Sequence, residues 1–125
     1  MGEMRLFALR GAARCLNTEA DIQEQTVGLY DELLLRNNLG EKDLVSVIFS
    51  VTGDLDAKNP AAALRQAGRA GEAALFVTQE ACFPGSLERV IRILIHCYLD
   101  SSQRPFHVYR NGAEVLRPDR STQAK

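Results

Sequence analysis

The chain has 125 residues, with 15 lysines and arginines against 16 aspartates and glutamates, for a formal net charge of −1. That length suits a single domain with one hydrophobic core, and the balanced charge argues against a broad surface for nucleic acid or membrane. The three cysteines lack paired or metal-ligand spacing, no apolar run approaches a membrane span and no signal peptide is visible, so we expect a cytoplasmic protein without a disulfide framework or metal site.

The first predicted elements are a short strand over residues 6–9 and a long helix over residues 18–37. Thr18 is a good N-cap, and Asp21 stands at the third helical position of a capping-box variant. Mostly apolar residues then recur at helical spacing: Ile22, Thr26, Leu29, Tyr30 and Leu33.

The second half of the chain is predicted to form mainly strands. Residues 45–51 alternate strictly between a strongly apolar set and a more polar set, which predicts a strand. Pro60 occupies a permitted first-turn position of a short helix over residues 60–67. Residues 87–99 fit a helix or a strand by periodicity, and their β-branched side chains favour a strand. Two further strands are predicted: residues 73–79 and 106–109.

This order of elements predicts an α+β fold, a single mixed sheet of about five strands with one long helix and one short helix. A single helical layer leaves the other face of such a sheet uncovered, and oligomerisation is the simplest way to cover it. We expect residues 1–125 to form one domain, with residues 118–125 as a mobile tail.

Two charged residues stand out because they adjoin apolar runs. Arg92 lies inside the run 90–95, and Glu80 follows the run 73–77. A guanidinium stays charged at ordinary pH, so an arginine in such a place needs an anionic partner. The pair therefore predicts either a structural ion pair or a polar pocket built into the sheet.

Other polar residues extend this pattern. Arginines with one glutamate and one tyrosine indicate a site for a small dianion that carries a hydroxyl. No nucleophile–base pair is visible, and the isolated His96 and His107 are expected to be packed or surface histidines. The additional arginines lie at element ends: Arg10, Arg65 and Arg117.

Over residues 5–121 the sequence resembles the non-helical, trimeric class of chorismate mutases. Each matching segment is weak alone, and their order and spacing together carry the resemblance: Leu9–Ala12, Thr52–Ala57, Pro60–Arg65, Gln79–Glu80, Pro84–Leu87, Val90–Arg92, His107–Tyr109 and Val115–Asp119. The resemblance implies a homotrimeric pseudo-barrel with active sites between subunits. It implies conversion of chorismate to prephenate, a concerted rearrangement that needs no cofactor, metal or covalent intermediate.

The same resemblance implies roles for individual residues. Arg92 donates to the ether oxygen as its bond stretches, and Arg10 binds a carboxylate near that oxygen. Glu80 accepts a hydrogen bond from the ring hydroxyl, and Tyr109 donates to a carboxylate. The implied wall and entrance residues are Ala61, Arg65, Val77, Leu116 and Arg117.

Three positions depart from the family pattern. Asn59, Ala62 and Val77 stand where the family often has phenylalanine, lysine and cysteine. These changes motivate one alternative, a catalytically silent homologue that binds a chorismate-type ligand. A second alternative is a trimeric imine deaminase of the small α+β family with similar architecture, which the motifs fit less well.

Overall fold

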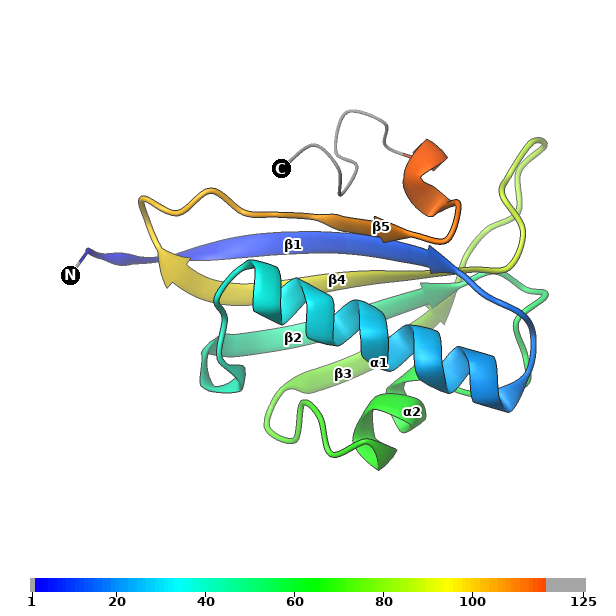
Figure 1. Cartoon of the computed structure of the whole chain (residues 1–125), viewed down its shortest axis with the longest axis horizontal. Helices are drawn as coiled ribbons and strands as arrows, with labels where there is room; N and C mark the ends of the chain where they lie inside the picture. The colour runs from blue at the N-terminus through cyan, green and yellow to red at the C-terminus, as the bar shows by residue number, and fades with distance from the viewer. Residues whose placement is uncertain (1, 117–125) are drawn as a thin grey trace.

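The protein, seen in a computed structural model that describes residues 2–116, is a five-stranded sheet with helices on one face (Figure 1). The sheet has the order β3-β2-β4-β1-β5. Its pairing is mixed, because β4 runs antiparallel to β1 and β2, while β1–β5 and β2–β3 are parallel. The α+β prediction is confirmed. The elements are β1 (Met4–Arg14), α1 (Glu19–Arg36), η1 (Glu41–Asp43), β2 (Leu44–Val51), α2 (Pro60–Gln66), β3 (Ala74–Gln79), β4 (Val90–Asp100), β5 (Val108–Arg110) and η2 (Ala113–Leu116).

The long helix α1 forms as its caps predict. The Thr18 hydroxyl accepts a hydrogen bond from the Asp21 N–H at 3.1 Å. The Asp21 carboxylate accepts from the Leu16 N–H at 2.6 Å, so the return bond of the capping box reaches the residue before Asn17. At the other end Asn37 is fully buried and its side chain donates to the carbonyls of Leu33 and Phe106. The helix is thereby tied to the segment that leads into β5.

The predicted strand over 6–9 is the middle of a longer strand, β1. The prediction ended it at Gly11, which instead lies inside the strand. A Cβ at this position would meet the Val108 carbonyl oxygen at 2.9 Å and Leu29 Cδ1 at 3.1 Å. Glycine is therefore the residue that lets β5 and α1 approach β1 closely.

The segment whose pattern was ambiguous, residues 87–99, mostly forms the strand β4, which ends one residue later at Asp100. This strand pairs with β1 on one side and β2 on the other, so it is the centre of the sheet. Burial alternates along β4, but its less buried face carries the apolar side chains of Leu94 and Tyr98 beside Arg92 and His96, so hydropathy alternates only weakly. That explains why the sequence pattern alone did not separate strand from helix.

The two faces of the sheet differ sharply. The face under α1 is the core, where the side chains of Leu9, Val47, Phe49, Ile93 and Ile95 are at most 2% exposed. The opposite face, called the open face below, carries Leu6, Phe76 and Tyr98, which are 49%, 64% and 45% exposed. Within residues 2–116 no helix combines the length and apolarity that crossing a membrane requires.

Candidate active site

The open face carries a row of polar side chains that crosses the sheet. Cross-strand register places Ser50 of β2 opposite Arg92 of β4, Arg92 opposite Ala12 of β1, and Ala12 opposite Tyr109 of β5. Residues paired in this way project from the same face of a sheet. The small side chain of Ala12 separates Arg92 from Tyr109 in the row.

Glu80 joins this row through two hydrogen bonds to one of its oxygens. The Arg92 Nε donates to Glu80 Oε1 at 2.7 Å, and the Ser50 hydroxyl donates to the same oxygen at 3.2 Å. The Glu80 N–H donates to the Val51 carbonyl at 2.8 Å, which fixes the Glu80 backbone beside β2 just beyond the end of β3. The sequence prediction that Arg92 and Glu80 are partners is thus confirmed.

The bonding leaves polar groups available to a ligand. Among residues 2–116, no hydrogen bond is made to Glu80 Oε2 or by the two terminal nitrogens of Arg92. The Arg92 side chain is 40% exposed and that of Glu80 is 19% exposed. An ion pair this accessible contributes at most about 1 kcal/mol to stability, so stabilising the fold is a weak explanation for placing two charges in the sheet.

Arg10 lies on the same face, one row along the sheet. It is opposite Leu94 on β4, which makes it a diagonal neighbour of Arg92. Its backbone N–H donates to His107 Nδ1 at 3.0 Å, so that histidine ring helps to hold the segment before β5 against β1. Two arginines and one glutamate therefore share this part of the open face, and a dianion would meet an excess of positive charge.

Tyr109 is held by a small apolar cluster at the β5 end of the row. It is 3% exposed and packs with Ala12, Val90 and Ala113. Leu116 packs against the same cluster from η2. Leu116 thus lies near the row, as its predicted role requires. The expected entrance residue Arg117 and the expected tail over residues 118–125 lie outside the described residues.

Three predicted site residues are not brought to this row. Ala61 is 5% exposed in the core beneath the helices, and Val77 packs against the same core, opposite the open face in the register of β3. Arg65 is an exposed residue of α2, which is tied to α1 by a bond from Gln23 Nε2 to the Ala63 carbonyl at 3.0 Å. All three therefore belong to the helical side of their own chain.

One departure from the family pattern, Asn59, also has a structural explanation. The carboxamide oxygen of Asn59 accepts from the Ala61 N–H at 2.8 Å and the Ala62 N–H at 3.2 Å, so Asn59 is the N-cap of α2. The start of the helix itself therefore uses this side chain. Asparagine is among the best N-cap residues, and phenylalanine has no oxygen to cap with.

One matching segment has a clear structural task beside the row. The Thr52 hydroxyl accepts from the Val90 N–H at 3.0 Å and donates to Asp54 Oδ1 at 2.6 Å. The Asp54 carboxylate accepts from the Arg89 N–H, at 3.2 Å and 3.1 Å for its two oxygens. These bonds fasten the end of β2 to the start of β4, two residues before Arg92. They set the register that places Arg92 opposite Ser50.

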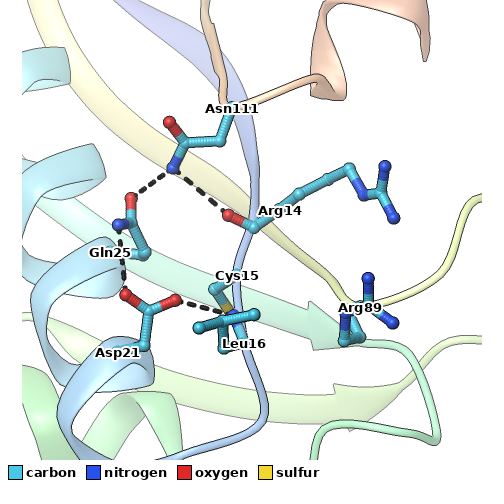
Figure 2. Close-up of a pocket in the computed structure, with 7 residues that line it drawn as sticks. All are labelled: Arg14, Cys15, Leu16, Asp21, Gln25, Arg89 and Asn111. Carbon is cyan, nitrogen blue, oxygen red and sulfur yellow. Dashed lines mark hydrogen bonds between the residues drawn. The ribbon is translucent and has the colours of Figure 1, made fainter.

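A separate cavity of about 380 Å³ lies where β1 runs into α1 (Figure 2). Its polar groups bind one another: Gln25 donates to Asp21 at 3.5 Å, and Asn111 donates to Gln25 at 2.6 Å and to the Arg14 carbonyl at 3.2 Å. Cys15 lines it, and burial, followed by the nearby Asp21 carboxylate, raises the pKa of that thiol to about 11. The hydrogen bonds around the cavity therefore connect β1, α1 and the end of β5. None of the predicted site residues lines it.

The described residues also bear on metals and nucleophiles. Across residues 2–116 no group of three or more histidine, cysteine or acidic side chains is arranged to hold a metal ion. Cys15 and Cys97 are buried free thiols and Cys82 is an exposed one. Adjacent His96 and Cys97 point to opposite faces of β4, since Cys97 is in the core and His96 Nδ1 lies 2.9 Å from the Ser46 hydroxyl.

Sequence reasoning missed Ser50. The alternation in residues 45–51 placed it on the more polar face of its strand, which was the available signal. Its contact with Glu80 depends on the order β3-β2-β4, and no local pattern encodes that order.

Comparisons with known proteins agree on one family. The family model for chorismate mutase type I matches residues 6–120. The chain is 39% identical over 117 residues to chorismate mutase AroH of Thermus thermophilus, covering 89% of this chain and 95% of that protein. It is 32% identical over 120 residues to chorismate mutase AroH of Bacillus subtilis (strain 168), covering 94% of each. Its fold is similar to that of a chorismate mutase from Clostridium thermocellum, with a TM-score of 0.80 and 41% identity, over 88% of this chain and 99% of that one.

Proposed function

The chain belongs to the type I chorismate mutase family and is an enzyme that converts chorismate to prephenate in aromatic amino acid biosynthesis, and we propose that the polar row of the open face is its active site. The observation that carries this assignment is the shared contact of Ser50 and Arg92 with Glu80 Oε1, which leaves Oε2 and the terminal nitrogens of Arg92 available. No comparison supports the imine deaminase or the silent binder.

The chemistry of the rearrangement fits such a site. The ether C–O bond of chorismate breaks while a C–C bond forms, and no proton or covalent intermediate passes through the protein. The enzyme must hold a compact conformer and stabilise the negative charge that gathers on the ether oxygen. The terminal nitrogens of Arg92 are the donors for that oxygen, because its Nε is already committed to Glu80.

The remaining groups bind the parts of the substrate that do not react. Glu80 Oε2 accepts a hydrogen bond from the ring hydroxyl. Arg10, two residues before Ala12 on β1, and Tyr109, opposite Ala12 on β5, bind carboxylates. Arg92 offsets the charge of Glu80, so the dianionic substrate meets a net cationic surface. Because the rearrangement is concerted, such a site needs no nucleophile.

We also propose that the active enzyme is a cytoplasmic homotrimer whose subunits cover one another's open faces. The exposed Leu6, Phe76 and Tyr98 on that face support the assembly, since a single chain leaves them in water. Arg65 and Ala61 lie on the helical side of their own chain. Through the helical segment 60–66, Arg65 would therefore serve the site of a neighbour.

The test is turnover of chorismate by the purified protein and by Glu80→Gln, followed by ultraviolet absorbance with prephenate identified as the product. Glu80→Gln keeps the size of the side chain but loses the charge that orients Arg92, so kcat/KM should fall at least about tenfold. Glu24→Gln, at an exposed position of α1, is the matched control and should behave as wild type. Wild-type kcat/KM in Glu80→Gln would overturn the site assignment.

A further inference from the structure

Glu80 holds an unusual one-sided set of hydrogen bonds. Arg92 Nε at 2.7 Å and the Ser50 hydroxyl at 3.2 Å both donate to Oε1. An arginine beside a carboxylate often forms a two-bond fork that occupies both oxygens. Such a fork would consume Oε2 and a terminal nitrogen of Arg92, the groups that the proposed site needs for the substrate.

Ser50 is placed to disfavour that fork. It lies on β2 between Thr78 of β3 and Arg92 of β4 in the cross-strand register, so its hydroxyl sits on the sheet side of Glu80. The Glu80 backbone is fixed by its bond to Val51, yet its side chain keeps three rotatable bonds. A second donor on Oε1 selects the rotamer in which that oxygen faces the sheet and Oε2 faces away from it.

We propose that Ser50 is a positioning residue for the rearrangement. Its hydroxyl holds Glu80 Oε1 against Arg92 Nε, which keeps Oε2 for the substrate hydroxyl and the terminal nitrogens of Arg92 for the ether oxygen. This inference rests on the active site proposed above and adds a residue that does not itself touch substrate.

The test compares Ser50→Val with Ser50→Thr. The two variants have nearly the same shape and both suit a strand, but only threonine keeps a hydroxyl. We expect Ser50→Val to lower kcat about tenfold while KM changes less than about threefold, because preorganisation is lost and the charges remain. Ser50→Thr should stay within about threefold of wild type in kcat. Equal kcat values for the two variants would overturn the proposal.

Ser46→Ala is the matched control. Ser46 lies on the same strand and face, and its hydroxyl is bonded to His96 rather than to Glu80. Its removal should leave kcat unchanged. Circular dichroism and the mass of the assembly verify that every variant folds and associates, so a lost turnover is not a lost fold.

A double variant separates positioning from a general structural role. If Ser50 acts through Glu80, adding Ser50→Val to Glu80→Ala should change kcat less than about twofold. A full additional tenfold loss in the double variant would show that Ser50 acts elsewhere and would refute the inference. If Glu80→Ala itself keeps wild-type turnover, the proposed site fails first, and this outcome is distinct from failure of the Ser50 role alone.

Discussion

Replacing Arg92 with lysine keeps the positive charge but removes the separate nitrogens that bind Glu80 and that we propose bind the substrate. In the structure, Nε holds Glu80 at 2.7 Å while the terminal nitrogens have no hydrogen bond among residues 2–116. A lysine has one ammonium group at the end of a flexible stem. It can stay with Glu80 or reach the ether oxygen of the substrate, but one point charge does not do both with good geometry.

The expected cost follows from the lost donor. Removing one preorganised donor from a developing oxyanion typically lowers kcat by about a hundred- to a thousandfold, which corresponds to about 2.7–4 kcal/mol of barrier. KM should change much less, because the charge that attracts the dianion is retained. The variant should stay folded, since an ion pair with a 40% exposed arginine side chain contributes at most about 1 kcal/mol.

Steady-state loss of chorismate absorbance measures this directly, with circular dichroism and assembly mass as checks on the fold. Arg36→Lys is the matched control, because Arg36 Nε also binds a carboxylate oxygen, that of Glu32 at 2.8 Å, on the surface of α1. It should keep wild-type kcat. An Arg92→Lys enzyme within about tenfold of the wild-type kcat would refute the role of the guanidinium.

The remaining predictions concern the scaffold. Asn37→Ala should lower the free energy of unfolding by about 2–4 kcal/mol in urea titrations, because it removes three hydrogen bonds of a buried side chain, each worth about 1 kcal/mol; a loss below about 0.5 kcal/mol would contradict this. Asn59→Ala should lower the free energy of unfolding by about 1 kcal/mol, whereas Asn59→Asp keeps the cap and should leave that free energy unchanged. Equal losses in the two variants would contradict the capping role. At neutral pH a thiol reagent should label Cys82 quickly and the buried Cys15 and Cys97 only on unfolding, so rapid labelling of three thiols would be the wrong outcome. Burial raises the pKa of those two thiols to about 11 from an ordinary 9.0, so they stay protonated in the native state while unfolded thiols ionise, and the free energy of unfolding should fall as pH rises from 9 to 11.

The sequence predicted the elements whose signals are local. The helix α1 follows from the Thr18 cap and the spacing of apolar residues, and β2 follows from strict alternation. The length of β1 escaped prediction because Gly11 looks like a strand end, and its actual reason is the close approach of Val108 and Leu29 in three dimensions. Local patterns therefore do not predict the ends of an element when packing between distant segments sets them.

The residues of the candidate site likewise fall into those that local patterns predict and those that depend on the fold. Arg92 and Glu80 were recognisable because a charge beside apolar runs needs a partner, and the structure joins them. Ser50 was not recognisable, because its bond to Glu80 depends on which strands are neighbours. The placement of Ala61 in the core of its own chain, and of Val77 against that core, likewise depends on packing that spacing does not encode.

We propose that chorismate is rearranged in a site on the open face that a neighbouring subunit completes. Mixed trimers test it directly: Arg92→Ala and Arg65→Ala subunits, each of which we expect to be nearly inactive as a homotrimer, are unfolded together in equal amounts and refolded. If Arg92 and Arg65 serve one site from adjacent subunits, about a quarter of the sites in randomly mixed trimers regain both arginines, and chorismate turnover should return to that fraction of wild type. Mixed trimers with no more turnover than the parent variants would contradict the shared site.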